Sequence, residues 1–186
     1  MSGHNKWSQI KRQKGASDAA KSREFSRFSK LITLEAKKTA GNLTSPGVAS
    51  AVARAKAINM PKDSIERAIQ KGTSKDASDL EQVVYEWYGP GGVAVIVDAL
   101  TDNKNRTTQE IKHLLTKNGF ELGAQGSALW AFTKMGSGNL IPNEPLTELS
   151  EEDETSFVAL LNLFDEHEDV QRVFTNARGY ETTGDE

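Results

Sequence analysis

The 186-residue sequence predicts an α+β protein, in which an N-terminal three-helix basic domain is followed by an α/β sandwich of element order ββαβαβ. Three observations support this. Apolar residues recur at helical spacing up to about residue 72, whereas β-rich runs alternate with helical segments after residue 80. The stretch GTSKDASD between them has the composition of a linker. The charge changes sign at the same place, so we expect domains at residues 1–75 and 80–180.

The charge is divided unevenly between these two parts. Residues 1–75 contain 16 basic and 5 acidic residues, whereas residues 76–186 contain 7 basic and 21 acidic ones. The formal net charge of -3 conceals this contrast. Because salt screens exposed charges beyond about 10 Å at 0.1 M ionic strength, a polyanion responds to the local excess. The first 75 residues therefore predict binding to nucleic acid.

The composition excludes several classes of protein. Without cysteine the chain has no disulfide scaffold, thiol nucleophile or zinc site that needs thiolates. The three histidines are scattered, so we expect no metal and no cofactor; Glu110 and His113, one turn apart, read as a solvated surface pair. No apolar run approaches the roughly 18 residues of a membrane span, and the N-terminus lacks an apolar signal segment. We expect a cytoplasmic protein with no membrane partner.

Three amphipathic helices are expected in the basic part. The first covers residues 18 to about 40, and the second begins where Ser45 can cap the helix and Pro46 suits its first turn. The third runs from residue 61 until Gly72, which we expect to end it. The residues expected to face the core are Phe25, Phe28, Leu31, Ile32, Val48, Val52, Ala55, Ile58, Ile65, Ala68 and Ile69.

The acidic part is expected to combine strands with two helices. The expected elements are strands 83–88 and 93–100, helix 107–118, strand 128–134, an acidic helix capped by Ser150 and strand 170–175. The segment GPGG from Gly89 to Gly92 joins the first two strands. Because a strand and not a helix follows it, we interpret it as a hairpin turn rather than a phosphate-binding loop.

The candidate nucleic-acid contacts are mostly cations of the first domain, because Lys and Arg bind phosphates by charge and by hydrogen bonds. They are Lys6, Trp7, Lys11, Arg12, Lys14, Lys21, Arg23, Arg27 and Lys30, with Lys104 and Arg106 as auxiliary contacts. Trp7 either anchors its own segment on the helices or stacks on an RNA base. The alternative for the cations is a solvated surface balanced by the acidic half of the chain.

The polar loop before helix 107–118 permits a second interpretation. A magnesium-dependent active site would use Asp98, Asp102 and Asn105. No second carboxylate cluster or positioned base accompanies them, and capping of the helix by Asn105 or Thr107 explains the same residues. We therefore expect no enzymatic activity.

Several ordered motifs resemble the YebC/PmpR family. They are MSGHNKW at residues 1–7, AINMPKDSIERAIQKG at 57–72, YEWYGPGGV at 85–93, LTDNKNRT at 100–107 and KNG at 117–119, with a further likeness around DVQRV at 169–173. The family is described as probable transcriptional regulators in bacteria, and its mitochondrial members as translational activators of cytochrome oxidase. A role in helping ribosomes through proline-rich stretches is also attributed to it. The resemblance implies association with nucleic acid or the ribosome and no known enzymatic reaction.

One departure from the family concerns a third domain. Family members are usually longer, with a further α/β domain inserted within the second one. Here only Gly136 to Asn139 stands where that insertion would lie, so the sequence predicts a short form. The resemblance therefore implies the functions of the basic helical domain and not those of a cleft between two α/β domains.

The functional expectation is a non-enzymatic regulator of gene expression that acts in translation, through ribosomal RNA or other ribosome contacts. No helix of the basic domain shows an evident base-reading set, which favours recognition of shape and backbone. The alternatives are a transcriptional regulator that binds duplex DNA and, third, a nucleotide-processing enzyme.

The acidic segment from Glu148 to Asp169 has nine acidic residues and no Lys or Arg. The sequence permits three interpretations of this segment. It forms a face exposed to solvent, or it orients the molecule by repelling phosphate, or it covers the basic domain while no nucleic acid is bound. Permanent neutralisation of the basic domain by this segment would contradict the nucleic-acid prediction.

Overall fold

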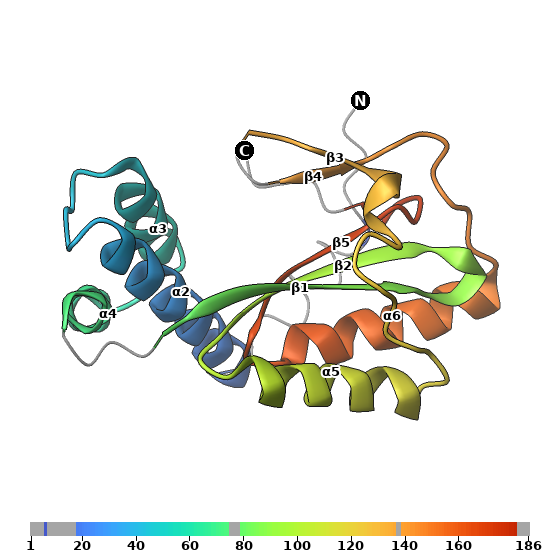
Figure 1. Ribbon diagram of the computed structural model, residues 1–186, viewed down its shortest axis with the longest axis horizontal. Coiled ribbons are helices and arrows are strands. Elements are labelled where there is room, and N and C mark those ends of the chain that lie inside the picture. Colours follow the sequence, from blue (N-terminus) through green and yellow to red (C-terminus); the bar gives the residue numbers. More distant parts are fainter. Residues whose placement is uncertain (1–5, 7–17, 75–78, 137–138, 182–186) are drawn as a thin grey trace.

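The computed structural model describes residue 6 and residues 18–74, 79–136 and 139–181. A helical part, residues 18–74, lies beside one end of a sheet part, residues 79–181 (Figure 1). The structure confirms the mixed α+β class with helices first. No helix in the described ranges is both long and apolar enough to cross a bilayer.

The helical part consists of α2 (Asp18–Lys38), α3 (Pro46–Ala57) and α4 (Lys62–Thr73). Ser45 caps α3, since its Oγ accepts a hydrogen bond from the Val48 N–H at 3.4 Å. The buried core is Ile32, Ala51, Ala55, Met60, Ile65 and Ala68. Phe25 and Phe28 pack against it, so both are core residues as the apolar spacing predicted.

Helices α2 and α4 approach closely at Gly72. A Cβ at this position would lie 2.4 Å from the Thr33 carbonyl oxygen and 2.9 Å from the Ala36 Cβ. The Thr33 hydroxyl donates to the Ala68 carbonyl at 3.0 Å one turn earlier. Gly72 was expected to end the helix, but α4 continues through it to Thr73. Gly72 therefore allows α2 and α4 to pack closely and does not end α4.

The central sheet has three antiparallel strands in the order β1-β2-β5, namely Glu81–Tyr88, Ala94–Thr101 and Val170–Thr175. Tyr88 pairs with Ala94 across the GPGG turn, which confirms the predicted hairpin. Gly91 and Gly92 have φ of 65° and 77°, a region that glycine enters at little cost. The strand β2 is buried along its whole length.

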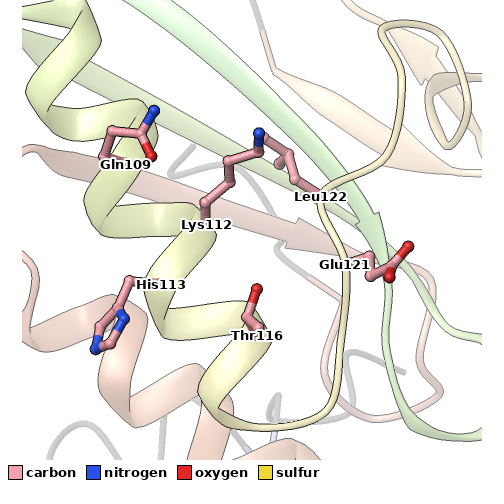
Figure 2. Close-up of a pocket in the computed structure, with 6 residues that line it drawn as sticks. All are labelled: Gln109, Lys112, His113, Thr116, Glu121 and Leu122. Atoms are coloured by element: carbon pink, nitrogen blue, oxygen red, sulfur yellow. The ribbon is translucent and has the colours of Figure 1, made fainter.

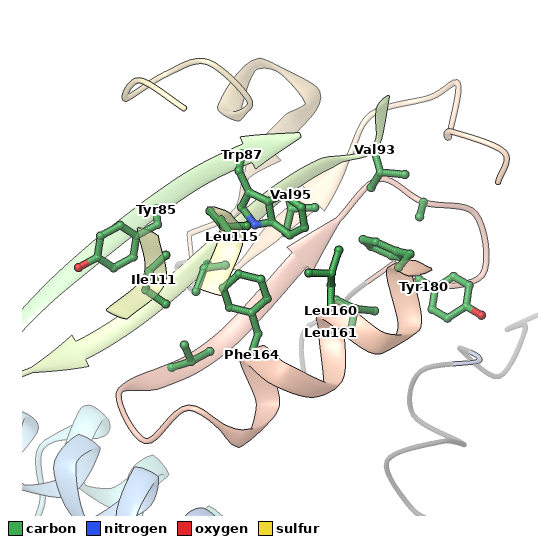
Figure 3. Packing of buried hydrophobic residues seen from close by; sticks show 14 of the residues in the cluster. Tyr85, Trp87, Val93, Val95, Ile111, Leu115, Leu160, Leu161, Phe164 and Tyr180 are labelled. Atoms are coloured by element: carbon green, nitrogen blue, oxygen red, sulfur yellow. The ribbon is translucent and has the colours of Figure 1, made fainter. Parts of the chain in front are cut away.

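Helices α5 (Lys104–Lys117) and α6 (Glu151–Glu166) cover one face of this sheet (Figures 1 and 3). Trp87 lies at the centre of their shared core, with its ring 5.5 Å from the rings of both Phe164 and Phe120. The burial of such large aromatic side chains fixes both helices against β1 and β2. Figure 3 shows Ile111 and Leu115 of α5 pointing into the same cluster.

The other face of the sheet departs from the sequence prediction. Instead of one strand at 128–134, a short 3₁₀ helix at Leu129–Ala131 precedes β3 (Phe132–Lys134), which pairs with the unpredicted β4 (Leu140–Pro142). The two form a separate two-stranded sheet, so the order is ββαββαβ. Strands of three residues are too short to show a period in the sequence. Apolar residues of this hairpin pack on Ile96 and Phe174 of the central sheet.

We expect the substitution Gly72→Ala to destabilise the helical part by about 1 to 3 kcal/mol, because the added methyl group overpacks the α2–α4 contact. The gain in helix propensity from alanine is smaller than this cost. A lower thermal unfolding midpoint, followed by circular dichroism, would measure it.

The matched control is Gly136→Ala, where a Cβ would meet no heavy atom within 4 Å. It should leave the midpoint nearly unchanged. An unchanged midpoint for Gly72→Ala as well would contradict the close approach.

Candidate nucleic-acid interface

Three of the cations predicted to bind nucleic acid lie outside the sheet part and contact its carboxylates. Arg27 of α2 is buried, and its guanidinium pairs with the Asp165 carboxylate at 3.1 Å and also donates to the Asp165 carbonyl. Lys30 pairs with Asp169 and donates to the Glu168 carbonyl at 3.2 Å. Both contacts join α2 to the segment at the end of α6. They hold the helical part against the sheet part.

Lys6 makes a third and more exposed contact. Its Nζ lies 2.7 Å from the Glu154 Oε1, which also accepts a hydrogen bond from the Tyr180 hydroxyl at 2.7 Å. The Lys6 bond, followed by that from Tyr180, holds the pKa of Glu154 below its ordinary value. The Lys6 side chain stays 59% exposed, so this pair stabilises the fold by at most about 1 kcal/mol.

Asp169 is the centre of the junction between the two parts. Its side chain is 3% exposed, and its carboxylate accepts hydrogen bonds from Lys30, from Arg106 at 3.0 Å and from the Thr107 hydroxyl at 2.6 Å. Burial alone would raise its pKa, but the bonds from Lys30, Thr107 and Arg106 outweigh burial and hold the pKa far below the ordinary value. One buried charge therefore connects α2, α5 and the start of β5.

The motif LTDNKNRT positions the α5 side of this junction. Strand β2 ends at Thr101, whose Oγ1 accepts from the Asn103 N–H at 2.9 Å. Asn103 then caps α5, since its Oδ1 accepts from the Arg106 N–H at 3.1 Å. Capping at Asn105 or Thr107, as the sequence suggested, is therefore wrong. The tight turn brings Arg106 and Thr107 to Asp169.

The structure does not assemble the candidate magnesium site. Asp98 is buried and accepts bonds from Gln82 at 2.7 Å and from Arg172 at 2.9 and 3.2 Å. It shares a face of β2 with Ile96, which packs on the β3–β4 hairpin. Asp102 instead pairs with Arg106 at 3.0 Å beside α5, and Asn105 is exposed. Asp98 and Asp102 therefore have separate partners, and Asn105 faces solvent.

Glu110 and His113 do not form the expected surface pair. Glu110 lies 3.3 Å from the His167 Nε2, and the His167 Nδ1 accepts from the Asp169 N–H at 3.2 Å. Ligand atoms of Glu110, His167 and Asp169 gather within 4.8 Å of one another. Since two cations already bind the Asp169 carboxylate, a divalent metal would have to displace them. The cluster fits an ion-pair network better than a metal site.

Other predicted contacts remain available or lie outside the described residues. Lys21 and Lys104 are exposed and Arg23 is half-buried, and none of the three forms an ion pair within the part of the chain that the structure describes. Four predicted contacts lie outside that part: Trp7, Lys11, Arg12 and Lys14. Two exposed lysines of the helical part without such pairs were not predicted as contacts: Lys56 and Lys71.

The residues that sequence reasoning missed are the carboxylates that bind α2. Asp165 and Asp169 lie 138 and 139 residues from their partners Arg27 and Lys30. The only signal was the acidic segment ending at Asp169, for which covering of the basic domain was one of three interpretations. The contacts support that interpretation for Arg27 and Lys30. They do not extend to Lys21.

Comparison with known proteins identifies relatives of both parts. A family model described as the TACO1/YebC protein N-terminal domain matches residues 5–75, and one described as the TACO1/YebC second and third domain matches residues 80–139. A "Probable transcriptional regulatory protein" of Treponema denticola is 51% identical over 73% of this chain and 56% of its own length. One of the same name from Thermotoga petrophila is 48% identical over 81% of this chain and 60% of its own.

A solved structure supports the fold. The crystal structure of a conserved hypothetical protein from Aquifex aeolicus matches with a TM-score of 0.76 and 27% identity, over 87% of this chain and 91% of that chain. The matched region of the present chain spans somewhat more than half of the two curated relatives described above, 56% and 60% of their lengths.

We expect Asp169→Asn to lower the free energy of unfolding by roughly 1.5 to 3 kcal/mol at pH 7, because it removes the charge-assisted hydrogen bonds from Lys30 and Arg106 to a buried carboxylate. Urea unfolding would measure the loss. The control Asp102→Asn removes an exposed partner of the same Arg106 and should cost under about 1 kcal/mol. Equal effects of the two changes would contradict the central role of Asp169.

The stabilisation from Asp169 should also depend on pH. Its folded-state pKa is lowered from the ordinary 3.8, so its contribution is fully present above that value and is lost as the pH falls further. The difference in stability between the parent protein and Asp169→Asn should therefore narrow progressively below about pH 4. A difference that stays constant from pH 7 to pH 2.5 would show that the carboxylate charge is not responsible.

Proposed function

Because the chain belongs to the TACO1/YebC family, as its motifs indicated, we propose that it is a nucleic-acid-binding regulator of gene expression. Relatives carry the name "Probable transcriptional regulatory protein", and a regulator of this kind acts on nucleic acid or on the machinery that reads it. We propose further that this chain acts in translation, through RNA or ribosome contacts, and without enzymatic chemistry.

The observation that carries the proposal is the excess of positive charge in the first 75 residues. These residues contain 16 basic and 5 acidic residues, and the ion pairs with the sheet part use only a few of the cations. Lys21, Lys56 and Lys71 are exposed on the helical part and form no ion pair within the described ranges. A phosphate backbone supplies the counter-charges that this surface lacks.

The predicted contacts divide into two groups by their burial. Arg27 and Lys30 hold the two parts of the molecule together, so we propose a structural role for them. Lys21 and Arg23 are the proposed phosphate contacts of α2. Lys11, Arg12 and Lys14, which precede this helix in the sequence, are further proposed phosphate contacts, and Trp7 is the proposed base-stacking residue. Lys6 is exposed and can exchange its half-buried partner Glu154 for a phosphate at little cost, because ion pairs at the surface are weak.

Two further predicted contacts lie at the start of α5. Lys104 is exposed and has no ion pair in the described part of the chain, so we keep it as an auxiliary phosphate contact. Arg106 shares its guanidinium between Asp102 and Asp169, and we assign it to the junction rather than to the ligand. Hydrogen bonding to Asp169 raises the pKa of Arg106 still further.

RNA is favoured over DNA by the kind of contact that the helical part offers. The exposed residues of α3 are Pro46, Ala49, Ser50, Ala53, Arg54, Lys56 and Ala57, a set with few base-reading groups. Recognition of shape and backbone suits folded RNA. The names of the relatives favour the second candidate, a transcriptional regulator that binds duplex DNA.

We expect combined neutralisation of Lys11, Arg12, Lys14 and Lys21 to glutamine to abolish binding at about 150 mM salt, because each phosphate that is no longer neutralised weakens counterion release. Fluorescence anisotropy with a stem-containing ribosomal RNA fragment at several salt concentrations would measure affinity and salt slope. The slope of the logarithm of the binding constant against the logarithm of the salt concentration should decrease in magnitude by about 0.9 for each duplex phosphate that the variant no longer neutralises.

The control changes the same number of charges elsewhere, at Lys38, Lys62, Lys134 and Arg178. Three of these already pair with a glutamate, namely Lys38, Lys62 and Arg178. The control should change affinity and slope only slightly. Unaltered affinity and slope for the first variant would refute the proposal.

The choice between RNA and DNA can be tested in cells. Crosslinking followed by sequencing of the bound nucleic acid should recover ribosomal RNA if the chain acts in translation. Enrichment of promoter fragments, with a preference of at least ~10³ for one duplex over random duplex at matched salt, would support the DNA candidate instead.

A further inference from the structure

The few cations of the sheet part are concentrated on one helix. Of the seven basic residues after residue 75, four lie on α5: Lys104, Arg106, Lys112 and Lys117. The two arginines outside α5 pair with carboxylates, Arg172 with Asp98 and Arg178 with Glu148. Within the described ranges, the lysines of α5 and Lys134 form no ion pair. Helix α5 therefore carries most of the uncompensated positive charge of an otherwise acidic part.

The outward stripe of α5 has a chemical character of its own. Asn105, Gln109, Lys112 and Thr116 follow the spacing i, i+4, i+7 and i+11, and all four are exposed. The opposite stripe, with Ile111 and Leu115, is buried in the core. The outward stripe thus offers amides, a hydroxyl and an ammonium group, and it contains no carboxylate.

Figure 2 shows that three residues of this stripe, Gln109, Lys112 and Thr116, line a groove with the segment that follows α5. Gln109, Lys112, His113 and Thr116 come from the helix, and Glu121 and Leu122 lie on the other side of the groove. The flanking segment stands along one side of α5 and narrows access to the helix from that side. Insertion of α5 into the major groove of B-DNA, which is about 8.5 Å deep, needs both sides of the helix to be clear.

From this arrangement, and resting on the nucleic-acid function proposed above, we infer that the outer face of α5 is a second contact surface, which binds the minor groove of double-stranded RNA. That groove is wide and shallow and displays 2′-hydroxyls between two rows of phosphates. The amides of Asn105 and Gln109 can donate to and accept from 2′-hydroxyls. Lys104, Lys112 and Lys117 supply charge to the phosphates on either side.

The position of α5 allows one RNA helix to contact both parts of the protein. Arg106 and Lys30 meet at Asp169, so the first turn of α5 lies against α2. Helix α5 has 14 residues, which corresponds to a length of about 21 Å. A polyanion that binds α2 therefore meets the start of α5 without any rearrangement of the fold.

The carboxylates nearest to this surface do not cancel its charge. Glu110 is directed to His167 at 3.3 Å and to Arg106 at 3.9 Å. Glu121 stands across the groove, where it would repel a phosphate and so confine the RNA backbone to the α5 side. Helix α6 lies beside α5 in the same helical layer (Figure 1), and its first turn carries Glu151, Glu152, Asp153 and Glu154.

The inference is tested with the double variant Lys112→Gln/Lys117→Gln in the full chain. With an RNA duplex as the probe, the salt slope should decrease in magnitude by about 0.9 for each phosphate that is no longer neutralised, and affinity at 100 mM salt should fall about tenfold or more. The matched control Lys134→Gln/Arg178→Gln removes the same charge away from α5 and should leave both quantities nearly unchanged. Equal losses of affinity in the two variants would overturn the inference.

A second variant separates recognition of RNA from charge alone. Gln109→Ala should weaken binding to the RNA duplex about threefold to tenfold without changing the salt slope, because it removes a neutral hydrogen bond. Binding to a DNA duplex of the same sequence should not change. An equal effect on RNA and DNA, or no effect on either, would overturn the assignment to the RNA minor groove.

The outcomes also distinguish this inference from the proposed function. If the variant at residues 11, 12, 14 and 21 loses binding while both α5 variants bind like the parent, the function stands and the second surface is wrong. If the parent protein binds neither RNA nor DNA, both proposals are wrong.

Discussion

The buried carboxylate of Asp169 is the interaction on which the arrangement of the molecule depends. A charge with a 3% exposed side chain is tolerated only because Lys30, Arg106 and Thr107 all bind it. These partners come from the helical part and from the start of α5, so the charge fixes both relative to the central sheet. Hydrophobic packing stabilises each part by itself, for example around Trp87 in the sheet part. The contacts to Asp169, in contrast, set how the helical part and the sheet part are oriented relative to each other.

The separation of charge along the chain consequently serves two purposes. Some of the attraction between the basic and acidic halves is used within the molecule, where Arg27 and Lys30 meet Asp165 and Asp169. In the function that we propose, exposed cations outside this junction, such as Lys21, bind a polyanion. The formal net charge of -3 for the whole chain reveals neither of these two roles. The observed pairs account for only part of the positive charge, so internal neutralisation and ligand binding are compatible.

Much of the fold could be predicted from local signals, and the site could not. The Ser45 cap and the turn at Gly91 are determined by a few neighbouring residues, so the sequence shows them directly. The β3–β4 hairpin was missed because its strands are too short for a periodic pattern. The partner of Lys30 lies 139 residues away, a contact that only the fold creates. The stripe around Gln109 escaped notice because a polar exposed face is the usual state of any surface helix.

The second sheet has a consequence for how this architecture can change in length. Lys134 pairs directly with Leu140, so the end of β3 and the start of β4 are neighbours in space at the tip of this hairpin. Additional sequence placed there would leave the pairing of Phe132 with Pro142, and the core beneath it, intact. Lengthening such a tip adds only a slowly growing entropic cost. The tip is thus a position at which an entire domain can be inserted or removed, in evolution or when a reporter is attached by engineering.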